Sequence, residues 1–181
     1  MINPKQVSSR VFANCFNLKE AKCGEQVTNM IQWYINCRNL VEAVCGPNVI
    51  SMSSTYSGCS NLTKPVCGEK VRSLEGTYSS CSSLEWAVCG PNVVDMSSTY
   101  YNCANLKTAV CGLNVRNMVR TYEKCPSLEY PVCGNNVTNM YGAYSNCANL
   151  KFAVCGDNVL DFSHAYENCS FLKYPVCGEK V

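Results

Sequence analysis

The chain has 181 residues, a formal net charge of +2 and 15% charged residues. A charge this small gives no electrostatic reason to expect binding to nucleic acid or to an anionic membrane surface. No stretch approaches the roughly 18 consecutive apolar residues of a membrane span, and the N-terminal ten residues lack the apolar run of a signal peptide. We therefore expect no nucleic-acid partner and no membrane insertion.

A unit of 22 residues is repeated along the chain. The dipeptide Cys-Gly recurs with a step of 22, a second cysteine series has the same step, and together they account for all 16 cysteines. The Cys-Gly series is Cys23, Cys45, Cys67, Cys89, Cys111, Cys133, Cys155 and Cys177; the second is Cys15, Cys37, Cys59, Cys81, Cys103, Cys125, Cys147 and Cys169. Eight such units nearly fill the chain, which predicts a single repeat solenoid over residues 1–181 with a core shared between stacked coils.

The first coil, residues 1–23, is atypical. Lys5 and Ser8 occupy positions that hold Val and Met in later units, and Lys22 stands where later units have Val. A solenoid needs a polar outer face at its ends. We interpret this coil as an N-terminal cap.

The apolar residues of a unit begin with helical spacing. Val137, Met140, Tyr144, Cys147 and Leu150 are separated by steps of 3, 4, 3 and 3. The residues between them are mostly Ser, Thr, Asn and Gly, which are poor helix formers. The pattern predicts one short turn of α or 3₁₀ helix per coil, with the tyrosine in the core and its hydroxyl bonded near the surface.

The spacing then changes. Leu150, Ala153 and Cys155 fall at positions one, four and six of a segment that ends at Gly156. This pattern predicts a strand of about four or five residues closed by a glycine turn, with positions four and six facing the core.

These residues resemble a known repeat. The run Leu-x-x-Ala/Pro-Val-Cys-Gly, followed by Val-x-x-Met-x-x-x-Tyr-x-x-Cys-x-x-Leu, is similar to the BspA-like leucine-rich repeat of bacterial surface proteins, and Val11-Phe-Ala-Asn-Cys15-Phe-Asn-Leu18 matches it well. The resemblance covers essentially the whole chain. It implies a leucine-rich-repeat-like solenoid, with a parallel β-sheet on one face and short α or 3₁₀ turns on the other. It also implies an extracellular or cell-surface adhesin-type protein, and a similar array would suit a bacteriophage fibre or virion.

At its C-terminal end the chain stops at Gly178-Glu-Lys-Val181, partway into a further unit. We expect no C-terminal cap, so a partner, a second copy or further protein should cover this end.

The cysteines allow three interpretations. A metal site usually uses closely paired Cys-x-x-Cys motifs, whereas here each pair is Cys-x₇-Cys. A disulfide within a coil fails on distance, and one between successive coils would be strained. Free thiols that pack as small apolar residues are the favoured interpretation, so we expect no metal and no cofactor.

The outward strand face carries the candidate binding residues. Position three varies between charged and aromatic residues, which places it outside, and position five has the same parity. The candidate binding residues at position three are Trp86, Thr108, Tyr130, Phe152 and Tyr174, and those at position five are Val88, Val110, Val132, Val154 and Val176. A soluble monomer does not normally leave so large an apolar patch in water.

Three interpretations of this face stay open. It can bind a protein or glycan ligand, with Trp86, Tyr130, Phe152 and Tyr174 as rigid anchors. It can reflect only the preference of strands for β-branched and aromatic residues. It can also pack against another sheet in a dimer or fibre. We favour a recognition or adhesion module, with structural self-association as the alternative.

Nothing in the sequence favours an enzyme. The one histidine, His164, has Asp161 and Glu167 at helical spacings, which is typical of a salt-bridged surface residue. No serine or cysteine sits in a nucleophile motif, and no glycine loop for phosphate precedes a helix.

Overall fold

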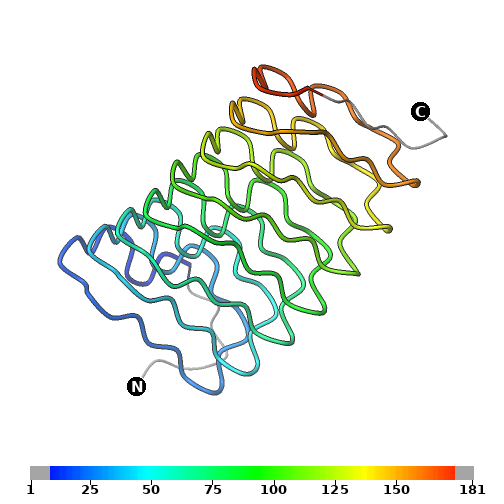
Figure 1. Cartoon of the computed structure of the whole chain (residues 1–181). Coiled ribbons are helices and arrows are strands. Elements are labelled where there is room, and N and C mark those ends of the chain that lie inside the picture. The colour runs from blue at the N-terminus through cyan, green and yellow to red at the C-terminus, as the bar shows by residue number, and fades with distance from the viewer. Residues whose placement is uncertain (1–8, 174–181) are drawn as a thin grey trace.

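The 22-residue units stack into one elongated solenoid in the computed structural model, which describes residues 9–173 (Figure 1). Equivalent residues of successive units lie side by side, because parallel bridges join residues 22 apart, such as Glu20 with Glu42 and Asn29 with Ser51. The first and the last of the described units lie at opposite ends of the stack (Figure 1). Each unit therefore finds most of its packing partners in the units next to it.

Within residues 9–173 the backbone forms no helix and no extended strand, and it pairs only through isolated parallel bridges. One column of bridges joins Glu20, Glu42 and Lys64, and then Trp86, Thr108 and Tyr130. A second, continuous column joins Asn29, Ser51, Ser73, Asp95, Asn117, Asn139 and Asp161. The predicted parallel arrangement is present, but the predicted strand of four or five residues is wrong.

The buried tyrosines explain why the strand is so short. The Tyr100 hydroxyl donates to the Val88 carbonyl at 2.8 Å and accepts from the Val88 amide at 2.7 Å. The same pair of bonds ties Tyr34 to Lys22, Tyr56 to Val44, Tyr78 to Val66, Tyr122 to Val110, Tyr144 to Val132 and Tyr166 to Val154. A residue whose amide and carbonyl both bond a side chain has neither group left for a ladder between coils.

The predicted helical turn is also wrong. Two residues of each unit have positive φ, for example Ser98 at 50° and Asn102 at 59°. Left-handed residues four positions apart cannot belong to a right-handed helix. Between them, Thr99 donates its amide to Met96 within the unit, whereas Tyr100 donates to the next unit. The segment is thus a run of turns in which every second amide bonds the neighbouring coil.

The core follows the predicted side-chain positions although the backbone is not helical. Val93, Met96, Tyr100, Cys103 and Leu106 are all fully buried, and the equivalent residues of the other central units are too. Successive tyrosine rings from Tyr34 to Tyr144 stack with centroids 5.4 to 5.8 Å apart. The predicted burial of the tyrosines is confirmed.

A column of buried threonines joins the units through hydrogen bonds. Its members are Thr55, Thr77, Thr99 and Thr121, all with no exposed surface. The Thr99 hydroxyl lies 2.9 Å from the Leu74 carbonyl of the preceding unit and 2.7 Å from the Met96 carbonyl of its own. In the described part of the chain, no buried side-chain nitrogen or oxygen lacks a partner. Burial of these hydroxyls therefore does not incur the free-energy penalty of a buried polar group without a hydrogen bond.

The two cysteine series differ in burial. Cys37, Cys59, Cys81, Cys103, Cys125, Cys147 and Cys169 are buried, as predicted, whereas the Cys-Gly series from Cys23 to Cys155 is only half-buried and Cys15 is exposed. The predicted core position of the Cys-Gly series is therefore wrong. From Cys23 to Cys133, each thiol of this series lies at the edge of the core, against the glycine of the next unit: a Cβ atom at Gly90 would be 2.7 Å from the Cys67 Sγ. No disulfide bond joins any two cysteines between residues 9 and 173.

Candidate functional site

The structure brings the predicted position-three residues together in one exposed column. The aromatic column consists of Trp86, Thr108, Tyr130 and Phe152, whose neighbours in the column lie 22 residues apart in the chain. Parallel bridges join Trp86 to Thr108 and Thr108 to Tyr130. Trp86 is 45% exposed and Tyr130 is 52% exposed, so both can reach a partner without a change of fold.

Tyr130 contacts two side chains of the next unit, Lys151 and Phe152. Its ring lies 5.9 Å from the Phe152 ring with an interplanar angle of 59°. The Lys151 ammonium sits 4.8 Å from the centre of the Tyr130 ring and donates to the Tyr130 hydroxyl at 3.0 Å. The bonds that Lys151 makes to Glu129 and Tyr130 raise the pKa of its ammonium group. The ring is therefore held from two sides and needs little ordering on binding.

Ion pairs border the aromatic column. At position two, Lys107 bonds Glu85 at 2.8 Å and Lys151 bonds Glu129, whereas Lys64 and Glu42 pair at position three itself, in the units before Trp86. All six side chains are about half exposed, so each pair contributes little stability. Because the charges are already paired, the border is polar but nearly neutral.

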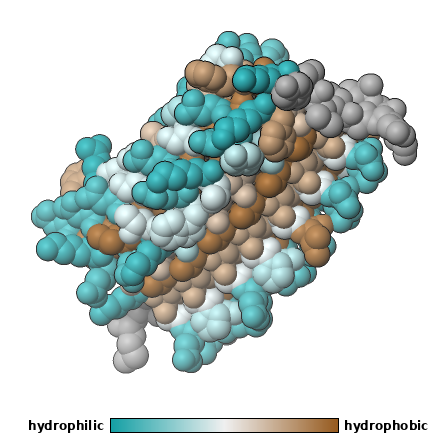
Figure 2. Space-filling model, viewed as in Figure 1, coloured by the Kyte–Doolittle hydropathy of each residue, from teal (hydrophilic) through white to brown (hydrophobic). Residues whose placement is uncertain are grey.

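The position-five valines form a second column beside the first. This valine column consists of Val44, Val66, Val88, Val110, Val132 and Val154, all half-buried. Figure 2 shows an apolar strip along the length of the solenoid with hydrophilic side chains on both sides. The valines are less exposed than the alternation of a regular strand predicts, because their backbone groups turn inward to the tyrosine hydroxyls.

A shallow hollow of about 490 Å³ lies at the Phe152 end of the aromatic column. Its lining consists of Glu129, Asn149, Lys151, Phe152, Phe171 and Lys173. The predicted site residues Tyr174 and Val176 lie outside the described residues, as do Lys5, Ser8, Cys177 and the C-terminal Gly178-Glu-Lys-Val181.

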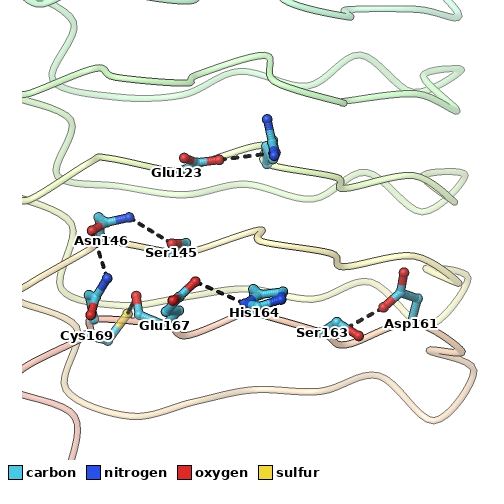
Figure 3. A network of polar contacts seen from close by, with 10 residues as sticks. Glu123, Ser145, Asn146, Asp161, Ser163, His164, Glu167 and Cys169 are labelled. Carbon is cyan, nitrogen blue, oxygen red and sulfur yellow. Dashed lines mark hydrogen bonds and ion pairs between the residues drawn. The ribbon is translucent and has the colours of Figure 1, made fainter.

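His164 takes part in a surface network rather than in a reactive arrangement (Figure 3). Its Nδ1 lies 3.0 Å from a Glu167 carboxylate oxygen, and its ring packs edge-on against Tyr141. The Asp161 carboxylate accepts the Ser163 amide at 3.0 Å and so closes a local turn. This arrangement agrees with the predicted salt-bridged surface histidine.

The described part of the chain holds neither a cluster of metal-ligating side chains nor a membrane-spanning helix. No group of three or more His, Cys, Asp or Glu side chains between residues 9 and 173 is placed to hold a metal ion. In the same range there is no helix with the length and apolar character needed to cross a membrane.

Several exposed residues were not predicted from the sequence. Leu113 and Leu160 are 85% and 87% exposed, and Arg72 and Arg116 are exposed on the column that follows the buried valine of each unit. The recurring Asn side chains, predicted to serve turns, also join units: Asn92 Nδ2 donates to the Glu69 carbonyl at 2.8 Å. A comparison for variable residues at every repeat position, rather than at the strand positions alone, would have shown that Arg72 and Arg116 share one variable position.

Comparison with known proteins identifies the family. The BspA type leucine rich repeat region matches residues 2–85 and 52–173 in six copies. The chain therefore belongs to the BspA-type leucine-rich repeat proteins. No curated protein matches the sequence.

Solved structures share the fold. A leucine rich repeat protein of T. pallidum (TpLRR) is 18% identical with a TM-score of 0.67, and the match covers 81% of this chain and 72% of that one. A leucine-rich repeat protein from Bacteroides ovatus is 14% identical with a TM-score of 0.55, over 94% of this chain and 58% of that one. The fold is thus that of bacterial leucine-rich repeat proteins, and at this identity the likeness concerns the fold alone.

Proposed function

We propose that this protein is a non-enzymatic recognition module that binds a protein or glycan ligand through the aromatic column and the adjoining valine column. The observation that carries the proposal is the pair of exposed aromatic rings at Trp86 and Tyr130, of which the Tyr130 ring contacts Phe152 and Lys151. Tryptophan and tyrosine dominate the energetics of protein interfaces because they bury a large area with few rotatable bonds. Successive coils hold them in one line.

The composition of the face favours a protein ligand over a glycan. Apolar valines and aromatic rings occupy the centre, and paired charges such as Glu85–Lys107 and Glu129–Lys151 form the border. An apolar centre with a polar rim is the usual anatomy of protein interfaces. Membership of the BspA-type family supports adhesion at a bacterial surface or on a virion as the setting of this binding.

A second candidate function is self-association, and the continuous valine column favours it. An apolar strip with a constant step from coil to coil can pack against the same strip of a second copy, because both have the same period. Residues 9–173 span about seven and a half units, or about 36 Å at the spacing of neighbouring strands. A strip about 15 Å wide along this length would bury close to 1,100 Å² over two copies, near the lower bound for a stable interface.

Binding to printed arrays of secreted proteins and of oligosaccharides tests the proposal. Trp86→Ala and Tyr130→Ala should each weaken the strongest wild-type signal about tenfold or more. Leu113→Ala, which removes an even more exposed apolar side chain elsewhere, is the control and should keep the signal. The proposal fails if both aromatic variants bind every array member as the wild type does.

A further inference from the structure

A column of exposed residues on another part of the coil is the basis of a separate inference. It follows the buried valine of each unit and consists of Thr28, Ile50, Arg72, Val94, Arg116, Thr138 and Leu160. Its backbone is a continuous ladder: Val94 donates its amide to the Arg72 carbonyl at 2.8 Å, and Arg116 donates to the Val94 carbonyl at 2.9 Å. The two arginines are therefore held two coils apart, with Cα atoms about 10 Å from each other.

These two arginines differ from the others in their partners. Arg10 bonds Gln32, Arg38 packs over the Phe16 ring and Arg120 pairs with Glu123. Among residues 9–173, no side chain makes a hydrogen bond or ion pair with the guanidinium groups of Arg72 and Arg116. Both groups can bind an external anion without first giving up an internal contact.

The space between the arginines is a shallow hollow of about 380 Å³, lined by Arg72, Asn92, Val94, Asn114 and Arg116. We refer to these five residues as the arginine site. The amide nitrogens of Asn92 and Asn114 each donate at 2.8 Å to a backbone carbonyl of the preceding unit. These bonds fix both side chains and leave their oxygens as acceptors for hydroxyl groups.

The charged neighbours of the arginine site leave it positive. Asp95 follows Val94, but its carboxylate accepts the Ser97 amide at 2.9 Å and makes no ion pair with either arginine. Glu69 and Lys70 carry opposite charges in the turn before Arg72, and the Lys70 ammonium bonds the Asn48 side-chain oxygen of the preceding unit at 2.6 Å. The site therefore presents two separated guanidinium groups, two amide acceptors and one apolar contact at Val94.

From this arrangement we infer that the arginine site binds an acidic polysaccharide. Guanidinium groups match carboxylate and sulfate groups through paired hydrogen bonds. An acidic polysaccharide that alternates charged and neutral sugars carries its anionic groups at a spacing of the same order as the two arginines. Its intervening hydroxyl groups suit the asparagine oxygens, and the apolar face of a sugar ring suits Val94. The site shares no residue with the aromatic or valine column, so this binding does not depend on the proposed function.

Calorimetric titration with defined oligosaccharides at about 0.15 M salt, where the Debye length is about 8 Å, tests the inference. The probes are a hyaluronan octasaccharide, with a carboxylate on every second sugar, and a chondroitin sulfate octasaccharide, which adds sulfate groups. We expect the wild type to bind at least one of them and not to bind maltooctaose, which is neutral. The double variant Arg72→Gln/Arg116→Gln should lose about tenfold or more in affinity, from two exposed charge contacts.

The matched control is Arg38→Gln/Arg120→Gln, which removes the same charge from exposed positions elsewhere. Its affinity should stay within about twofold of the wild-type value, because salt screens the attraction between the anionic probe and arginines far from the binding site. An equal loss in this control would overturn the inference, since it would show non-specific attraction by net charge. So would absence of wild-type binding to both acidic probes, or equally tight binding of an octaglutamate peptide, which would assign the site to acidic proteins.

Discussion

From Gly46 to Gly156, the glycine of each Cys-Gly pair packs closely against the preceding unit, and Gly90→Ala tests whether this packing requires glycine. A Cβ atom at Gly90 would lie 2.7 Å from the Cys67 Sγ and 3.0 Å from the Gly68 carbonyl oxygen of the preceding unit. Cβ atoms do not approach other heavy atoms this closely, so the two coils would have to move apart. Forced insertion of one methyl group into a packed region costs about 1–3 kcal/mol. We expect Gly90→Ala to lower the free energy of unfolding by this amount.

Gly24→Ala is the matched control for this substitution. Gly24 follows the first half-buried cysteine of the same series, but a Cβ atom there would have its nearest neighbour, on Val27, 3.9 Å away. The alanine should be tolerated there and can stabilise the protein slightly by reducing the freedom of the unfolded chain. Urea titrations followed by circular dichroism measure both effects. If Gly90→Ala unfolds at the same urea concentration as Gly24→Ala, the close approach between units is refuted.

Two further predictions concern the polar groups of the core. Tyr100→Phe removes the hydrogen-bond partner of both backbone groups of Val88 and should lower the free energy of unfolding, measured by urea titration, by about 1–3 kcal/mol. The control is Tyr101→Phe, which removes a surface hydroxyl that accepts a bond from Lys124 and should change the free energy of unfolding little. Equal losses in the two variants would contradict the proposed role of the Tyr100 hydroxyl. Burial raises the pKa of Cys59 and Cys103 from 9.0 to about 12, so the folded state holds these protons more tightly than the unfolded state. Their contribution to stability is full below pH 9 and is lost as the pH rises toward 12, at about 1.4 kcal/mol per pH unit for each thiol. The double variant Cys59→Ala/Cys103→Ala should therefore lose stability less steeply between pH 9 and 11, and parallel curves would refute the assignment.

The sequence predicts the repeat, its register and most of the core because these depend on side-chain period alone. Val93, Met96, Tyr100, Cys103 and Leu106 are buried as their spacing predicts. The period of three and four residues reports which side chains face inward, and both a helix and a run of turns can satisfy it. The composition argues against a helix, because Ser, Asn and Gly are poor helix formers and fill most of the positions with positive φ.

The backbone conformation of the strand segment could not be predicted, because it depends on hydrogen bonds to one side-chain hydroxyl in each unit. The Tyr100 hydroxyl bonds both the amide and the carbonyl of Val88, so these groups cannot pair with a neighbouring coil. The β-strand that the residue pattern around Val88 predicts therefore does not form. Such a bond spans 12 residues and depends on the three-dimensional closure of the coil. For the same reason the valines are half-buried and the following cysteines lie at the edge of the core.

The candidate site was predicted in part. The exposed positions of Trp86 and Tyr130 follow from the charged residues that fill the same column in other units, such as Glu42. The repeat register places Arg72 and Arg116 in one column, but their lack of partners and the hollow between them are visible only in the folded coil.

The mass of the protein in solution tests the proposed recognition function most directly. Light scattering at micromolar concentration should give the mass of one chain, because a recognition module presents the aromatic and valine columns to a different molecule. A mass of two chains or more, reduced to one by Val110→Lys with Val132→Lys, would contradict the account and assign the apolar columns to self-association.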